Sequence, residues 1–355
     1  MATFSDTGWL LLITLIKIAV VVLVMLTSIA YLTWLERKVV AHIQSRWGPY
    51  LVGYSGLMQP LADGLKFILK EDIVPLEVDT IVYWLAPFLA LTLAFLSIAV
   101  IPFGESFTIH GRTIFFQITD LNVGLLFVFA VTSLGVYSVA LAGWSSNSKY
   151  PLLGGLRSSA QMISYELSLG LAVVGVLMMA GTLSLRGIVD SQSGFWHIAG
   201  VNTFLPHWNI FVQPVGFLVY FTAAVADTNR VPFDLPEGES ELVGGYHTEY
   251  SSMKFAMFFM SEYANMITVS CLATILFFGG WHGPVFGPYV LRVLLPVFWF
   301  CFKLFCFLFF YIWMRGTLPR FRYDQLMAFG WKFLLPLGLL NVLATSFVVA
   351  RISSP

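Results

Sequence analysis

The sequence is poor in charged residues. Only 11% of its 355 residues are Asp, Glu, Lys or Arg, whereas 58% are hydrophobic. Soluble domains usually carry about 25% charged residues, so a chain with so little charge cannot remain dissolved in water as a monomer. The scarcity of charge, together with long apolar runs, indicates an integral membrane protein.

Other absences exclude classes of function. The 19 basic residues are balanced by 19 acidic residues, which argues against nucleic acid as a partner. The chain has no glycine-rich nucleotide-binding motif. Its three cysteines lie in apolar runs, without the spacing of a zinc or iron–sulfur site: Cys271, Cys301 and Cys306. We therefore expect this chain alone to hold no metal, cluster or redox cofactor and no catalytic residue.

Eight apolar segments predict an all-α integral membrane protein with a single domain over residues 1–355. They cover roughly 9–34, 80–102, 121–142, 159–180, 211–227, 253–279, 289–313 and 331–350. The N-terminus lacks the cationic start and cleavage site of a signal peptide, so we expect the first segment to be retained. The chain shows no internal repeat of the kind found in transporters.

Lysine and arginine are distributed unequally between the connections. Thirteen of them follow the first, third, fifth and seventh segments, and only four lie on the opposite side. Because inner loops are enriched in Lys and Arg, this bias predicts that both termini lie on the outer side.

The first inner connection contains the amphipathic stretch GLMQPLADGLKFILKED. Apolar residues recur at helical spacing and charged residues take the other face: Leu57, Leu61, Leu65 and Ile68 against Asp63, Lys66 and Lys70. The stretch is too short to span a bilayer, so it predicts a helix that lies at the inner interface.

Several carboxylates lie within or beside the apolar segments. A charge at the centre of a membrane helix costs roughly 2.5–3.5 kcal/mol on insertion scales, so Glu166, Asp227 and Glu262 need partners or water. Ser158 and Gln161 resemble a capping box, which predicts that the Glu166 helix begins there. Each carboxylate could make an isolated polar bond between helices. At similar depths on neighbouring helices, the three would instead form a proton relay.

The stretch ADTNRVPFDLPEGESELVGGYHTEY, residues 226–250, adds carboxylates at the inner side. It holds six of the 19 acidic residues: Asp227, Asp234, Glu237, Glu239, Glu241 and Glu249. Carboxylates this crowded cannot all ionise, so some would hold protons near neutral pH. The stretch therefore extends the predicted proton path from the inner side into the membrane.

Two inner connections mix basic and aromatic residues, in WLERKVVAHIQSRWGP and MRGTLPRFRYDQLM. They supply Glu36, Arg37, Arg46, Arg315 and Arg320. A cavity lined in this way could hold a flat polar head group with an oily tail. The same composition is also typical of an ordinary aromatic belt beside positively charged inner loops.

Five stretches resemble the H subunit (subunit 1 in mitochondria) of proton-pumping NADH:quinone oxidoreductase, respiratory complex I. They are ERKVVAHIQSRWGP, PLADGLKFILKED, TNRVPFDLPEGESELVGGYHTEY, FFMSEYANM and LPRFRYDQLM. The resemblance covers nearly the whole chain and implies a subunit with eight spans that forms much of the quinone chamber. It also implies partner subunits in the membrane arm and in a hydrophilic arm, which would hold NADH, FMN and the iron–sulfur clusters, with quinone as substrate and lipid around the chain.

The resemblance also assigns residues to the two parts of the site. Those implied for the quinone passage are Glu36, Arg37, Arg46, Asp63, Arg315 and Arg320. Those implied for the acidic proton path are Glu166, Asp227, Asp234, Glu237, Glu239, Glu241 and Glu262. One departure is that Asp227 stands where the family usually has glutamate.

Two other functions remain open on the sequence. They are a membrane subunit of a related energy-converting hydrogenase, which uses no quinone, and an autonomous ion transporter. The chain is longer than we expect of the organellar subunit, so we favour a bacterial inner membrane over a mitochondrial one. The sequence leaves the role of Lys303 open.

Overall fold

The computed structural model describes residues 4–109, 112–198, 201–234 and 244–353. Within these residues, seven helices are long and apolar enough to cross a membrane. Six are single helices: α1 (Phe4–Ile43), α3 (Thr80–Ile98), α4 (Gly124–Ser145), α5 (Lys149–Ala180), α10 (Ser252–Phe277) and α11 (Tyr289–Thr317). The seventh runs through α12 (Tyr323–Phe329), a π-helical turn (Gly330–Leu334) and α13 (Leu335–Ser353). The chain is therefore a helical, multi-pass membrane protein.

Shorter elements connect these helices. The short helices are α2 (Gln59–Leu69), α6 (Leu185–Ser191), α7 (Asn209–Val212) and α8 (Pro214–Asp227), with 3-10 turns η1 (Tyr54–Gly56) and η2 (Gly245–His247). Two antiparallel hairpins pair β1 (Phe107–Ile109) with β2 (Arg112–Ile114), and β3 (Phe195–Ile198) with β4 (Val201–Pro206). Helix α8 has 14 residues and is shorter than the seven spans. The predicted eighth crossing therefore stays a prediction.

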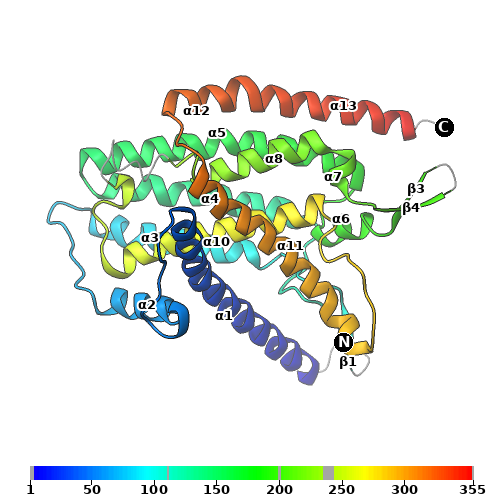
Figure 1. Ribbon diagram of the computed structural model, residues 1–355, viewed down its shortest axis with the longest axis horizontal. Coiled ribbons are helices and arrows are strands. Elements are labelled where there is room, and N and C mark those ends of the chain that lie inside the picture. The colour runs from blue at the N-terminus through cyan, green and yellow to red at the C-terminus, as the bar shows by residue number, and fades with distance from the viewer. Residues whose placement is uncertain (1–3, 110–111, 199–200, 235–243, 354–355) are drawn as a thin grey trace.

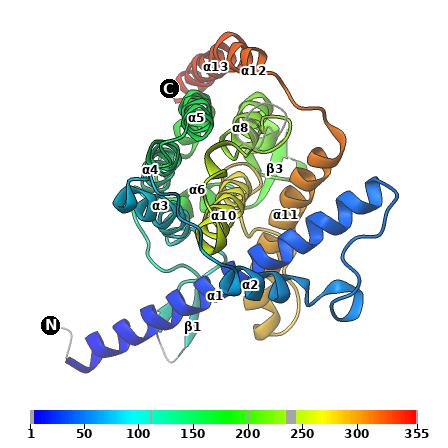
Figure 2. The ribbon, with the colours of Figure 1, turned by 90° about the vertical axis from the view of Figure 1, so that its left-hand side faces the viewer.

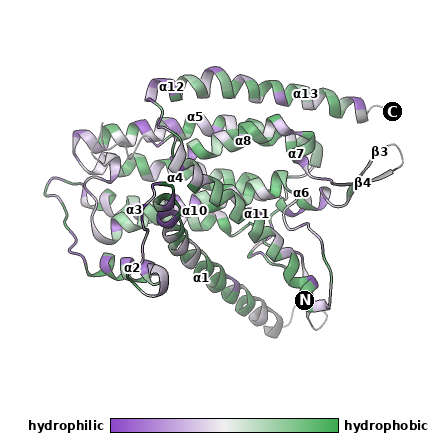
Figure 3. Ribbon diagram, in the orientation of Figure 1, coloured by the Kyte–Doolittle hydropathy of each residue, from purple (hydrophilic) through white to green (hydrophobic). Residues whose placement is uncertain are grey.

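Helices α3, α4, α5, α8 and α10 run side by side as a bundle, and α1 and α11 cross it obliquely (Figures 1 and 2). Helix α1 begins, and α13 ends, at the end of the molecule that carries both hairpins. We call this the hairpin end. The opposite end carries α2 and the beginnings of α5 and α12, and hydrophilic residues gather there (Figure 3). We call it the basic end after Lys66 of α2, Lys149 of α5 and Arg322 before α12. The start of α1 and the end of α13 thus lie on the same side of the bundle.

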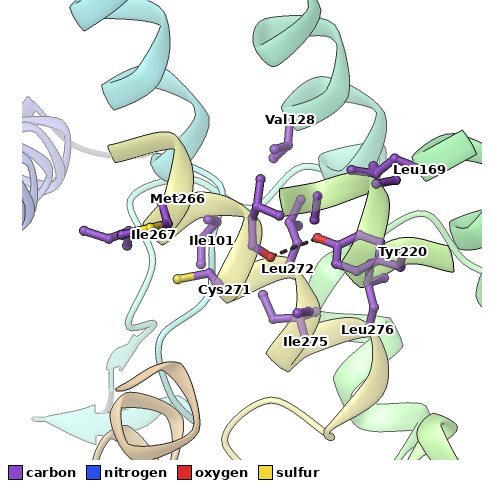
Figure 4. Close-up of a cluster of buried hydrophobic side chains, with 14 of the residues drawn as sticks. Ile101, Val128, Leu169, Tyr220, Met266, Ile267, Cys271, Leu272, Ile275 and Leu276 are labelled. Atoms are coloured by element: carbon purple, nitrogen blue, oxygen red, sulfur yellow. Dashed lines mark hydrogen bonds between the residues drawn. The ribbon is translucent and has the colours of Figure 1, made fainter. Parts of the chain in front are cut away.

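Helix α10 forms the centre of the bundle. Most of its residues are buried, from Ser252 at the basic end to Phe277 at the hairpin end. Tyr220 of α8 points toward α10 (Figure 4), and its hydroxyl donates a 2.9 Å hydrogen bond to the carbonyl of Val269. Because most of α10 is buried, its polar side chains face neighbouring helices or internal cavities.

The prediction that the Glu166 helix begins at Ser158 was wrong. Helix α5 starts at Lys149, so Ser158 and Gln161 lie inside it. Both side chains are buried, and Gln161 donates to carbonyls in the last turn of α8 and in the segment after it instead of capping its own helix. The first turns of α5 pack against η2 and α4, so tertiary contacts extend the helix beyond its apolar run. Helix α1 likewise continues past residue 34, to Ile43.

At the hairpin end, Lys303 of α11 stabilises the connection that follows α10. Its buried ammonium donates three hydrogen bonds of 2.7–2.9 Å, to the carbonyls of Phe278, Gly280 and His282. All three ammonium protons are thereby used. The ammonium also lies 4.5 Å from the ring centroid of Trp208, a cation–π distance. These contacts give Lys303 a structural role that the sequence left open.

We expect Lys303→Met to loosen this connection. The substitution leaves three carbonyls without their charged donor, and a buried group without its partner costs about 1–3 kcal/mol. Amide hydrogen exchange of a peptide covering residues 278–288 should therefore accelerate by about tenfold or more. Lys17→Met is the control, because the parental Lys17 donates one hydrogen bond, to the carbonyl of Gln117, and lies outside this connection. Unchanged exchange in the Lys303 variant would contradict this role.

Candidate functional site

A large cavity lies at the basic end, between α1, α2 and α10. Its volume is about 810 Å³, and sites for small molecules and cofactors typically measure about 300–1,000 Å³. Most of the residues that line it are apolar or aromatic. Its charged lining residues are Glu36, Arg37, Arg46, Asp63 and Arg315. The cavity therefore combines an apolar wall with a cluster of charge.

The structure brings together five of the six residues that the sequence assigned to a quinone passage, because these five all line the large cavity. Arg37 and Asp63 join α1 to α2 through an ion pair of 2.5 Å between Nη1 and Oδ2. Arg320, the sixth, is not among the lining residues. Its Nη2 instead lies 3.0 Å from Oδ2 of Asp234, another residue singled out in the sequence. The roles of these residues in binding stay predictions.

Glu36 lies at the centre of a cluster of charged side chains. Tyr263 donates a hydrogen bond of 2.9 Å to Glu36 Oε2, and Nη1 of Arg230 lies 3.4 Å from the same oxygen. The other carboxylate oxygen pairs with Arg315. The Arg230 guanidinium also lies 4.3 Å from the ring centroid of Tyr263. Glu36 and Arg230 are both buried, so each charge depends on the other in a region of low dielectric.

A second, much smaller cavity lies among α3, α4, α5, α8 and α10. Its volume is about 30 Å³, enough for a water molecule where polar groups surround it. Asp227 and Glu262 line it together with Thr132, Ser138 and Asn265. We call it the acidic cavity. Three other acids of the predicted path, Glu237, Glu239 and Glu241, lie outside the residues that the structure describes.

Glu166 lies close to this acidic cavity. Its carboxylate accepts a hydrogen bond from Ser133 of α4, next to Thr132 in the cavity wall. Helix α5, which carries Glu166, packs against α8, and both helices contact α10. The three helices that carry Glu166, Asp227 and Glu262 are therefore neighbours, as a chain of carboxylates requires.

Comparisons with known proteins show the family of the chain. The family model for NADH dehydrogenase matches residues 16–346. The chain belongs to the NADH dehydrogenase family. The second NADH-quinone oxidoreductase H subunit of Koribacter versatilis is 60% identical, over 96% of this chain and 98% of that protein. The first H subunit of Solibacter usitatus is 52% identical, over 95% of this chain and 97% of that protein. The resemblance seen in the sequence is thus confirmed.

In this member of the NADH dehydrogenase family, α10 separates the two cavities. Glu262 lines the acidic cavity, and the next residue, Tyr263, lines the large cavity. Successive side chains on a helix point about 100° apart, so one turn of α10 serves both cavities. Arg230 follows Asp227 by three residues and reaches Glu36 on the other side. The cavities are therefore connected through polar groups on two short stretches of chain.

The segment that follows α8 is held at both ends. Nε2 of Gln161 donates to the carbonyls of Ala226 and Phe233, at 2.7 and 2.8 Å. The amide of Phe321 donates to the carbonyl of Pro232 at 2.9 Å. These bonds use no titratable group, so they can form in every protonation state of the nearby acids.

The sequence analysis missed Arg230, Tyr263 and His247 as site residues. His247 lies in η2, and its Nε2 is 3.8 Å from Oε1 of Glu262. Burial lowers the pKa of His247 to about 3, so the imidazole is neutral at physiological pH. Its neighbour Tyr246 donates a hydrogen bond of 3.1 Å to the same Glu262 oxygen. In the sequence, His247 stands between an acidic loop and an apolar run, and this pattern does not mark it as a site residue. Only folding places it beside Glu262.

We expect Glu36→Gln to destabilise the protein far more than Asp63→Asn. The first change removes the negative charge that compensates buried Arg230, which costs on the order of 3 kcal/mol. The partner of Asp63 is Arg37, whose side chain is 53% exposed, and such pairs contribute less than about 1 kcal/mol. Thermal unfolding of the purified complex should therefore shift only for Glu36→Gln. Equal shifts would contradict the importance assigned to the buried pair.

Proposed function

We propose that the chain is the quinone-site subunit of a proton-pumping NADH–quinone oxidoreductase. The observation that carries this proposal is the large cavity, because its apolar wall leads to the charged cluster around Glu36. An apolar wall suits the tail of a quinone. The charged and polar groups suit its carbonyl head group, which must receive two protons with two electrons to become quinol.

The electrons come from outside this chain. NADH, FMN and iron–sulfur clusters belong in this proposal to partner subunits of a hydrophilic arm that docks on the basic end. Other membrane-arm subunits contact the chain along its exposed apolar helices. The names of the Koribacter and Solibacter relatives support this assignment, since both are called subunits of a NADH-quinone oxidoreductase.

The acidic cavity carries the proton-coupling part of the proposal. Quinone reduction changes the charge near Glu36, and Arg230 and Tyr263 link Glu36 to the wall of the acidic cavity. The carboxylates of Asp227, Glu262 and Glu166 then exchange protons along α8, α10 and α5. Proton relays in membranes are built from such carboxylates on adjacent helices.

The membrane placement completes the proposal. Helices α7 and α8, separated by Gln213, together make the eighth crossing. The basic end faces the cytoplasm of a bacterium and the hairpin end faces the periplasm, as the Lys and Arg bias indicates. Helix α2 then lies at the inner surface, where its exposed side chains Leu61, Leu65 and Ile68 meet lipid.

We expect Gly64→Phe to block the large cavity without disturbing the fold. Gly64 lines the cavity from α2, and a Cβ added there meets no atom within 4 Å. The ring therefore occupies space that the quinone needs. NADH:quinone turnover should fall at least tenfold, or the quinone KM should rise as much. Electron transfer from NADH to an artificial acceptor should remain at the parental rate.

Gly170→Phe is the matched control for this test. Gly170 is also helical, a Cβ there also meets no atom within 4 Å, and it is not a lining residue of the large cavity. It should leave both activities unchanged. Parental quinone kinetics in the Gly64 variant would overturn the assignment of the large cavity to quinone and favour a subunit that couples without it.

We expect Glu166→Gln to preserve assembly and to stop coupled turnover. The glutamine can still accept the hydrogen bond from Ser133, but it cannot exchange a proton. Quinone reduction and proton pumping in membrane vesicles should both fall at least tenfold, and Glu166→Asp should retain intermediate rates. Asp190→Asn serves as control, because Asp190 lies in α6 at the hairpin end. Parental pumping by the Gln variant would make Glu166 an interhelical hydrogen-bonding residue only.

A further inference from the structure

A third cavity lies at the basic end, on the other side of η2 from the acidic cavity. Its volume is about 700 Å³. Its cationic lining residues are Lys66 of α2, Lys70 directly after α2 and Arg315 of α11. We call it the basic cavity. His247 also lines it. No described residue lines both the basic cavity and the acidic cavity. A proton that moves from one cavity to the other therefore has to pass through a side chain that lies between the two cavities.

His247 occupies that position. The side chain is buried, and its Nε2 has no hydrogen-bond partner among the described residues. Oε1 of Glu262, in the wall of the acidic cavity, lies 3.8 Å from this nitrogen. A small movement of either side chain, or one bridging water, would close this distance to a hydrogen bond. One residue thus lines the basic cavity and faces an acid of the other cavity.

Aromatic packing fixes the imidazole ring. The ring centroid of Tyr246 lies 3.8 Å away, and Phe255 and Phe258 pack edge-on at 5.7 and 5.4 Å. Burial also keeps the ring neutral. A neutral imidazole has one donor and one acceptor nitrogen, which is what a relay requires.

We propose that His247 is the residue through which protons pass from the basic cavity to Glu262, and so to the acidic cavity. This inference rests on the proposed function, since it supplies that function with a source of protons. It also assigns a direction: with the basic end facing the cytoplasm, uptake is from the cytoplasmic side.

The transfer step is balanced without any other reactant. A protonated water in the basic cavity gives a proton to the acceptor nitrogen of the ring. The opposite nitrogen releases its proton to the carboxylate of Glu262, so one N–H bond forms as the other breaks. The imidazole ends neutral, in its other tautomer, and one positive charge has moved from the basic cavity to Glu262.

The first test is His247→Phe in the intact complex. Phenylalanine retains an aromatic ring against Tyr246, Phe255 and Phe258 but has no nitrogen. We expect NADH:quinone turnover and proton pumping to fall at least tenfold, while electron transfer to an artificial acceptor stays at the parental rate. The control is Gly170→Phe, which adds the same ring at a helical residue that lines neither cavity and should have no effect.

The second test is chemical rescue of His247→Ala. The truncated side chain leaves a ring-sized space that adjoins the basic cavity, where added imidazole can bind. We expect imidazole to restore turnover at least fivefold, and pyrrole, which has a similar shape but no basic nitrogen, to restore none. Rescue by both compounds, or by neither, would show that His247 only fills space and would overturn the proposal. Parental pumping by His247→Phe would overturn it as well.

These outcomes are separable from a failure of the proposed function. If the His247 variants are active while Gly64→Phe and Glu166→Gln remain impaired, quinone binding and the acidic path stand, and only the route of proton uptake is wrong. If Gly64→Phe retains parental quinone kinetics, the quinone assignment itself is wrong, whatever the His247 variants show.

Discussion

The ion pairs of Glu36 join parts of the chain that lie far apart in the sequence. Arg230 follows α8, and Arg315 lies in the last turn of α11. Both guanidinium groups pair with the carboxylate of Glu36, and Tyr263 of α10 donates a hydrogen bond to the same carboxylate. A buried charge is tolerated only where its partners are in place. The positions of α1, α10, α11 and the segment after α8 are therefore mutually dependent. Both the charged end of the large cavity and its link to the acidic cavity exist only in this arrangement.

The dependence of these elements on the ion pairs of Glu36 also matters for the proposed mechanism. Because Glu36 already has three partners, a negative charge that appears on a bound quinone competes with it for Arg315 and Arg230. Gln161 and the amide of Phe321 hold the adjoining backbone through neutral hydrogen bonds, which this competition does not break. Charge can then be redistributed between the cavities while this backbone keeps its anchors.

Much of the fold could be predicted from the sequence, because hydropathy alone finds the seven long spans. The ends of helices were harder to predict. Helices α1 and α5 continue into polar sequence, where tertiary packing decides, and Ser158 and Gln161 looked like a cap although both face the protein interior. Of the site, the charged clusters near Arg37 and Arg315 were visible as motifs. Arg230 and His247 were not, because each acquires its partner through contacts that only folding creates.

The two faces of α10 also constrain how this helix can change. Glu262 and Tyr263 serve different cavities although they are adjacent, so their roles depend on the rotational phase of the helix as well as on their identities. Inserting or deleting one residue between Ser252 and Glu262 would turn the rest of the helix by about 100° and shift it by about 1.5 Å. The acid would then leave its cavity. Substitutions in this stretch can be tolerated one by one, whereas its length is fixed.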